Sequence, residues 1–298
     1  MNHLLALLTG ILISLMITLN GELAQTYGLH SGALFVHIVG LSVISIVILA
    51  RRERPFAKCF PWFYYIGGAI GVASVFFTNF PFGRISVSAI LALGLLGQSM
   101  MSILVDQWGL FGMPQHDFPK RKLAGFSLLL AGIIAMTTEL HFLALFFSFM
   151  AGVTIVVART INAKLSDSTS VAIGTFFNFF IGLVTAFALF VIFGRGEVGI
   201  AEAVQFSSFV PIYFGGAVGV CVVLISNHTV SKVPAFYLSL LLFIGQVFAG
   251  IVIDILLTGA FSGRNLIGGV FVAGGLVLNL LLDRRAEKES VKYKNAER

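Results

Sequence analysis

Two glutamines and two aspartates stand in matching pairs inside long apolar stretches. Gln98 follows a glycine and precedes Asp106 by eight residues. Gln246 follows a glycine and precedes Asp254 by the same spacing. In a membrane-crossing helix eight residues span about 12 Å, so an aspartate at one surface places its glutamine near the middle of a core about 30 Å thick. Because amides donate and accept hydrogen bonds, we expect both glutamines to face one cavity and bind a polar or zwitterionic solute. Bonding between neighbouring helices is the alternative role.

Other polar residues are candidates for gating or coupling. Asp106 and Asp254 would stand at opposite mouths of the cavity, either as proton- or cation-linked gates or as cap or interface residues, and the second role is favoured. Asn20 and Asn162 end the first and sixth apolar runs and have the same two interpretations. Polar groups inside a membrane are costly, so each one is a candidate for function.

Three further residues lie deeper in their runs. Histidine side chains can titrate near neutral pH, so His37 is a candidate proton carrier, with a hydrogen-bonded structural role as the alternative. Asn178 lies one residue before Phe179, the position that matches His37 in the second half, and is a weaker candidate for substrate binding. Arg159 either extends to the inner surface or holds an anionic solute, and the first is favoured.

The amino-acid composition indicates whether these residues belong to a soluble or a membrane protein. Of the 298 residues 58% are apolar and only 11% are charged, with a mean hydropathy of +0.99. Soluble domains have about 45–50% apolar and about 25% charged residues, so this chain cannot cover a soluble surface. A cytosolic enzyme, a nucleic-acid binder and a disordered chain are excluded, which leaves an integral membrane protein. The sequence contains no nucleotide-binding, nucleophile or metal motif, so we expect no enzyme activity, no cofactor and no metal.

Ten apolar runs have approximately the length that a membrane-crossing helix needs. They are continuous rather than alternating, which favours helices over a β-barrel. The expected spans are Leu4–Asn20, Gly32–Ala50, Pro61–Phe77, Val87–Val105, Leu123–Thr138, Phe142–Ile161, Val171–Phe193, Pro211–Ser226, Ala235–Leu256 and Leu266–Leu282. With a cytoplasmic N-terminus, all of the 19 Lys and Arg residues except Arg84, Arg195 and Arg264 fall on the inner side. This follows the positive-inside rule and explains the net charge of +6 without nucleic acid.

The two halves of the chain resemble each other. One constant offset along the sequence aligns Asn20 with Asn162, and a slightly larger offset aligns Gln98 with Gln246 and Asp106 with Asp254. Asn, Gln and Asp are scarce here, so chance does not explain their alignment. Since each copy holds five spans, the second copy enters the membrane from the opposite side, as in many secondary transporters.

Three segments also resemble a known family. They are Asn20-Gly21-Glu22-Leu23-Ala24, the Gly97-Gln98 pair, and the segment from Val105 to Gly112 that reads Val-Asp-Gln-Trp-Gly-Leu-Phe-Gly. They look like the inner-membrane exporters of the YdcZ type, within the drug/metabolite transporter superfamily. The resemblance implies a bacterial inner-membrane exporter of small organic solutes. The small multidrug relatives carry a coupling acid within their first span, whereas Leu4–Leu19 contains none.

We therefore expect an all-α polytopic membrane protein with ten transmembrane helices in two inverted five-helix repeats. Residues 1–141 form the first repeat, 142–283 the second, and 284–298 a basic cytoplasmic tail. The expected function is secondary active transport, in the export direction, of a small metabolite or drug by alternating access. A non-transporting scaffold or assembly factor is the alternative. The expected partners are the substrate, protons as a candidate coupling ion, the lipid bilayer and, as a candidate assembly, a second copy of the chain. The expected location is the bacterial inner membrane, with both termini in the cytoplasm.

Overall fold

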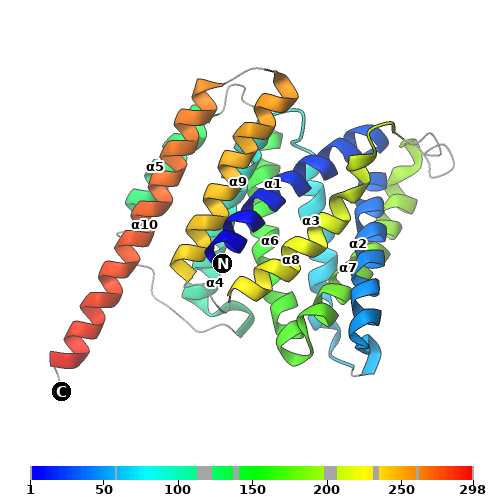
Figure 1. Ribbon diagram of the computed structural model, residues 1–298, viewed down its shortest axis with the longest axis horizontal. Coiled ribbons are helices and arrows are strands. Elements are labelled where there is room, and N and C mark those ends of the chain that lie inside the picture. Colours follow the sequence, from blue (N-terminus) through cyan, green and yellow to red (C-terminus); the bar gives the residue numbers. More distant parts are fainter. Residues whose placement is uncertain are drawn as a thin grey trace.

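The computed structural model describes residues 2–57, 59–112, 123–136, 141–197, 207–230, 235–259 and 262–296, which form a bundle of helices (Figure 1). Across these ranges every regular element is a helix, apart from an isolated bridge between Phe82 and Ile85. The α-helices are α1 (Asn2–Tyr27), α2 (Leu29–Arg51), α3 (Ile66–Asn79), α4 (Val87–Trp108), α5 (Leu123–Met136), α6 (Phe142–Ser168), α7 (Val171–Phe193), α8 (Gly215–Val230), α9 (Ala235–Thr258) and α10 (Gly263–Ala296). Short 3₁₀ turns are η1 (Pro55–Ala57), η2 (Trp62–Tyr64), η3 (Leu110–Gly112), η5 (Gly194–Gly196) and η6 (Val210–Phe214).

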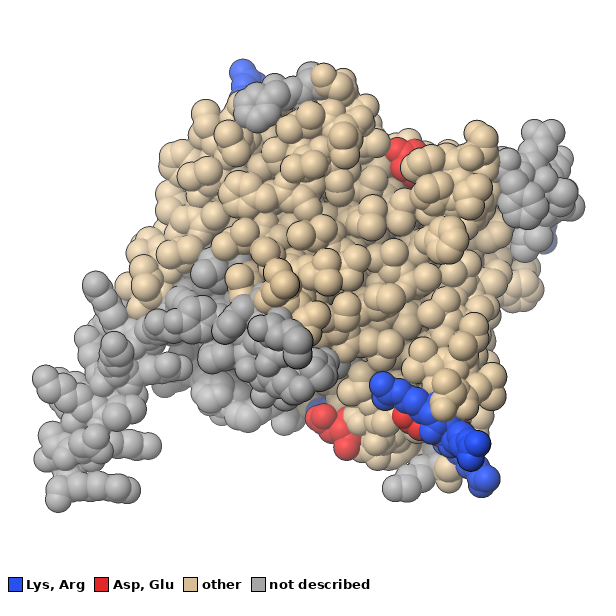
Figure 2. All heavy atoms as spheres, in the orientation of Figure 1, with Lys and Arg blue, Asp and Glu red and all other residues tan. Residues whose placement is uncertain are grey.

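Six of the described helical segments are long and apolar enough to cross a membrane. They are Leu4–Tyr27, Leu29–Arg51, Val87–Val105, Phe142–Ser168, Val171–Gly196 and Leu241–Thr258, and the shorter apolar helices are Ser127–Met136 and Val210–Ile225. Large apolar side chains such as Leu49, Ile134 and Leu256 are exposed on the outside of the bundle. In Figure 2 a broad uncharged surface separates described charged side chains near the two ends of the molecule. A surface of this kind suits contact with lipid.

Several helices extend beyond their apolar runs. Helix α1 continues to Tyr27 and ends before Gly28, whose φ of 100° is unfavourable for other residues. Asn20 therefore lies inside α1, and Asn162 lies inside α6, which continues to Ser168. The prediction that these asparagines end their helices is wrong. No proline follows either asparagine within its helix, and a single glycine such as Gly21 is tolerated inside a helix at a modest cost.

The C-terminal segment is also more regular than expected. Helix α10 continues from Gly263 through the basic tail to Ala296 (Figure 1). The prediction that the membrane span ends at Leu282 concerns hydropathy, whereas the helix itself needs only residues with adequate helix propensity. The sequence Arg-Arg-Ala-Glu-Lys after Asp283 consists of good helix formers.

Glycines allow the helices to pack closely at their main contacts. A Cβ on Gly10 of α1 would collide with the carbonyl oxygen of Leu242 in α9. A Cβ on Gly152 of α6 would collide with the carbonyl oxygen of Gly94 in α4. Helices α2 and α7 pack against each other, as do α5 and α10. Small residues at such contacts allow the backbones of membrane helices to approach closely.

The contact between α2 and α7 uses matching residues in a reciprocal way. The imidazole of His37 covers Gly182, and the ring of Phe179 covers Gly40. The offset that aligns Asn20 with Asn162 also aligns His37 with Phe179 and Gly40 with Gly182. Residues that the sequence comparison treats as equivalent therefore make equivalent contacts across the bundle.

Candidate functional site

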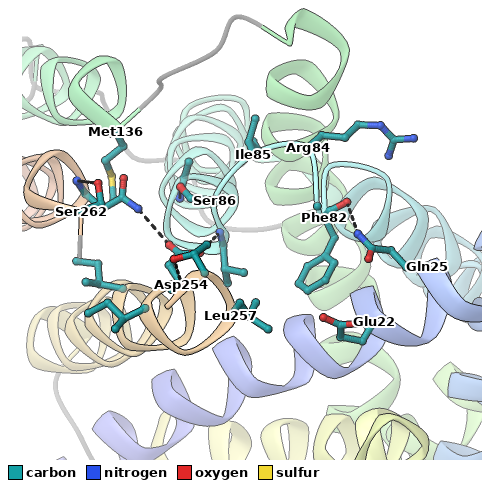
Figure 3. Close-up of a pocket in the computed structure, with 17 residues that line it drawn as sticks. Glu22, Gln25, Phe82, Arg84, Ile85, Ser86, Met136, Asp254, Leu257 and Ser262 are labelled. Atoms are coloured by element: carbon teal, nitrogen blue, oxygen red, sulfur yellow. Dashed lines mark hydrogen bonds between the residues drawn. The ribbon is translucent and has the colours of Figure 1, made fainter. Parts of the chain in front are cut away.

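A cavity of about 580 Å³ lies among helices from both halves of the chain (Figure 3). Its walls come from the end of α1, the segment that precedes α4, the first turn of α4, the ends of α5 and α9, and the start of α10. The lining residues are Glu22, Gln25, Phe82, Gly83, Arg84, Ile85, Ser86, Val87, Ala89, Met136, Ile251, Asp254, Ile255, Leu257, Thr258, Ser262 and Asn265. The cavity has the size and the mixed apolar and polar lining of a small-molecule site.

Asp254 is the most strongly hydrogen-bonded residue of this cavity. Its carboxylate accepts the backbone N–H groups of Val87 at 2.6 Å and Ser88 at 3.0 Å. It also accepts the hydroxyl of Ser88 at 2.6 Å and the side-chain amide of Asn265 at 3.3 Å. Only 8% of the residue is exposed.

These bonds make Asp254 a cap for a helix in the other half of the chain. The first N–H groups of a helix have no partner within it, and the helix dipole favours a negative charge there. Ser86 completes the cap because its hydroxyl accepts the N–H of Ala89. The sequence predicts that Asp254 is a gate or a cap or interface residue. In the structure Asp254 lies on α9 and contacts the first turn of α4, so it joins α9 to α4.

Three other charged or amide residues of the cavity are arranged differently. Glu22, on α1, makes no side-chain hydrogen bond or ion pair with the described residues. Gln25 donates its amide to the carbonyl oxygen of Phe82 at 3.1 Å. Arg84 donates to the carbonyl oxygen of Phe80, and its guanidinium lies 4.1 Å from the centroid of the Phe80 ring. Sequence reasoning misses Glu22 as a site residue, because the first apolar run ends at Asn20.

A second carboxylate cap joins α2 to the segment after α7. Glu197 accepts the N–H of His30 at 3.0 Å, the N–H of Ser31 at 2.9 Å and the Nδ1 of His30 at 2.7 Å. Partial burial disfavours its ionised form, but the hydrogen bonds from Ser31 and His30 outweigh burial and hold the pKa of Glu197 below its ordinary value. The carboxylate is therefore ionised at neutral pH and stabilises the first turn of α2.

An acid that follows α2 in the first half makes a similar contact with the start of α7. Glu53 follows α2 as Glu197 follows α7, and it accepts the hydroxyl of Ser170. Ser170 is in turn the N-cap of α7, where it accepts the N–H of Ile173 at 3.1 Å. Each half thus supplies an acid to the start of a helix in the other half.

The two predicted glutamines lie at helix contacts rather than in the cavity. Gln98 is half-buried on α4, and its backbone N lies where α6 approaches at Gly152. Gln246 on α9 is 5% exposed, and its carbonyl oxygen accepts the hydroxyl of Ser14 at 2.7 Å. Neither lines the cavity, and their side chains make no hydrogen bond with each other. Their predicted role in binding stays a prediction.

Two of the predicted asparagines are brought together. Asn162 donates its amide to the side-chain oxygen of Asn178 at 2.7 Å, which connects α6 to α7. The side-chain oxygen of Asn20 is buried and has no partner among the described residues. Val36 is the counterpart of Asn178 in the alignment of the two halves, so the first half lacks this hydrogen bond.

The remaining predicted residues occupy separate places. His37 is 3% exposed, and its Nδ1 bonds to the carbonyl oxygen of Ala33 at 2.8 Å. This geometry agrees with a hydrogen-bonded structural role for His37, the alternative to proton transfer. Arg159 is exposed on α6. Asp106 belongs to α4, but its side chain lies outside the described part of the chain.

The described residues contain no group of three or more His, Cys, Asp or Glu side chains arranged to hold a metal ion. Within the cavity the acidic residues are Glu22 and Asp254, and the hydrogen bonds of Asp254 go to protein donors.

Comparisons with known proteins agree with this architecture. A family model described as "Putative inner membrane exporter, YdcZ" matches the chain twice, over residues 1–135 and 143–278. A solved crystal structure has the same fold, with a TM-score of 0.61 and 14% identity, over 95% of this chain and 97% of that chain. The search of curated proteins found no match. Because the family model covers most of the sequence in two consecutive copies, the chain belongs to the YdcZ-type family of inner-membrane exporters.

Proposed function

We propose that the protein is a secondary active transporter that exports a small organic solute by alternating access. In this proposal ten helices cross the membrane as two five-helix halves of opposite orientation. The family match supports a transporter in the inner membrane. The helical, apolar architecture is suited to that environment.

The reciprocal contacts support the inverted arrangement. Glu53 contacts the start of α7, and Glu197 contacts the start of α2. Asn162 lies over Gly67 of α3, and Asn20 lies over Gly215 of α8. Contacts that exchange in this way are expected from two copies of one fold related by an approximate two-fold axis in the membrane plane.

The cavity is the observation that carries the transport proposal. Helices α1 and α4 belong to the first half and α9 and α10 to the second, so the cavity lies between the halves. With the N-terminus in the cytoplasm, α1 ends on the outer side, so the cavity lies near the outer surface. Relative movement of the halves would change the access of solute to it.

Reconstituted vesicles test this proposal. We would load them with one of three labelled probes of similar size, which are trimethylphenylammonium, phenylalanine and benzenesulfonate, and impose a pH gradient. At least one probe should leave faster than from protein-free vesicles. A scaffold or assembly factor would release none of them faster.

A matched pair of variants connects the flux to the cavity. Ile255→Trp places a larger side chain on the wall and fills part of the cavity, whereas Ile192→Trp adds the same side chain to the exposed surface of α7. Flux should fall in the first variant and persist in the second. Equal flux in the two variants would contradict transport through this cavity.

A further inference from the structure

We propose that the cavity binds a small organic cation, with Glu22 as its counter-ion. The inference rests on the proposed function for the passage of the ligand across the membrane, but not for its binding. It follows from the charged residues of the lining, which are Glu22, Arg84 and Asp254. Each of them has different partners in the structure.

Asp254 is already committed to the protein. Both of its oxygens accept hydrogen bonds, from the N–H groups of Val87 and Ser88 and from the side chains of Ser88 and Asn265. A ligand that took these oxygens would leave buried donors at the start of α4 without an acceptor. Since leaving buried donors without an acceptor is energetically costly, Asp254 is a poor counter-ion for a ligand.

Arg84 is held away from Glu22. Its guanidinium donates to the carbonyl oxygen of Phe80 and lies over the ring of that residue. Figure 3 shows the side chain of Arg84 pointing away from Asp254 and Glu22. Arg84 is the only Lys or Arg among the described residues that line the cavity, and it does not neutralise the carboxylate of Glu22.

Glu22 is the carboxylate that a ligand can reach. The residue is half-buried, lines the cavity and has no side-chain partner among the residues described. In Figure 3 it stands below Phe82, with its carboxylate toward the side of the cavity where Leu257 and Asp254 lie. An unpaired carboxylate beside apolar walls attracts a cation more strongly than one in water, because the local dielectric constant is lower.

The rest of the lining describes the body of the ligand. Phe82, Ile251, Ile255, Leu257 and Met136 supply apolar surface, and serine and asparagine side chains supply a few polar groups. A volume of about 580 Å³ accommodates a compact aromatic or branched ammonium ion. An anion of the same size would meet Glu22 without a described cation directed toward it.

Equilibrium dialysis of the purified full-length protein with labelled trimethylphenylammonium tests the inference. We expect saturable binding that unlabelled trimethylphenylammonium displaces and benzenesulfonate does not. Glu22→Gln should weaken binding by about tenfold or more, which corresponds to roughly 1.4 kcal/mol. Glu53→Gln, a matched change outside the cavity, should leave binding within about twofold of the parent, less than about 0.4 kcal/mol.

A second variant keeps the test decisive if Glu22→Gln does not fold. Leu257→Lys puts a cation at the half-exposed cavity wall and should also weaken binding. Absence of saturable cation binding, displacement by benzenesulfonate, or unchanged binding in these variants would overturn the inference. Saturable binding without flux in vesicles would remove the proposed transport function but not the cation site. Flux of phenylalanine or benzenesulfonate without cation binding would remove the cation site but not the proposed transport function.

Discussion

Single carboxylates join segments that lie far apart in the sequence. Asp254 bonds to residues 166 and 167 positions earlier in the chain, and Glu197 bonds to residues at the same separations. In both cases the acceptor meets the first N–H groups of a helix, where donors are unsatisfied and the dipole is positive. Each acid therefore caps a helix of the first half from a position in the second half.

Asp254→Ala should destabilise the protein by about 1–3 kcal/mol, because it leaves the N–H groups of Val87 and Ser88 buried without an acceptor. Asp254→Asn keeps one oxygen acceptor and should lose less. The measurement is the midpoint of thermal unfolding in detergent. Equal midpoints for the parent and the alanine variant would show that the cap contributes nothing to stability.

The Glu197 cap should make stability depend on acid. Its pKa is below the ordinary value of 4.5, so ionisation of this group favours the folded state. The contribution is fully present above the ordinary value and is lost as pH falls through the lower folded-state pKa. Thermal unfolding of the parent and of Glu197→Gln should therefore differ most at neutral pH and converge in acid. A difference that stays constant over this range would exclude the ionised cap.

Part of the site can be predicted from these residues alone. The alignment of Asp106 with Asp254 identifies Asp254 as a candidate site residue, since an acid inside an apolar run is costly without partners. Its donors could not be predicted, because the backbone N–H groups of Val87 and Ser88 have no signature of their own. Glu22 escapes prediction for a different reason: hydropathy falls after Asn20, whereas the helix continues to Tyr27.

Helix contacts depend on glycines that occur in matching positions. Gly10 and Gly152 are equivalent in the alignment of the two halves, and each lets one helix approach another until backbone atoms touch. Gly10 meets the backbone of Gly245 and Gln246, and Gly152 meets the backbone of Gly94 and Gln98. This arrangement favours the packing role for the backbone around Gln98 and Gln246.

Gly152→Ala should separate α6 from α4, because the added Cβ would collide with the carbonyl oxygen of Gly94. Overpacking of this kind typically costs about 1–3 kcal/mol. Gly263→Ala is the control, since a Cβ there meets nothing within 4 Å. The comparison is the unfolding midpoint of each variant. An equally small change in both would mean that the α4–α6 contact is loose.

The elements themselves are largely predictable from the sequence, and their ends are not. Long apolar runs predict helices at all ten places where the structure describes one. The third run is expected to start at Pro61, but α3 begins at Ile66 after the η2 turn. Hydropathy measures how well residues tolerate lipid, whereas a helix begins and ends where backbone hydrogen bonds find other partners.

At the scale of the whole molecule, the reciprocal contacts suggest how the halves move. Caps at the starts of α2 and α4 come from the second half, and the equivalent contact at the start of α7 comes from the first. In the proposed orientation the caps on α2 and α4 lie on the outer side and the contact on α7 lies on the inner side. During alternating access the outer contacts on α2 and α4 would form when the inner contact on α7 breaks, and the reverse.

The central claim is that the two halves enter the membrane from opposite sides, and cysteine labelling in intact cells tests it most directly. Cys59 is an exposed native residue in the segment after α2. Gly196 lies in the equivalent segment after α7 and has open space around it. One protein keeps only Cys59, through Cys221→Ser. The other carries Gly196→Cys together with Cys59→Ser and Cys221→Ser.

A membrane-impermeant maleimide should label the Gly196→Cys protein in intact cells, and the protein with Cys59 only after the membrane is permeabilised. That result would place equivalent segments of the two halves on opposite surfaces. Labelling of both proteins from the same side would contradict the inverted arrangement and with it the proposed mechanism.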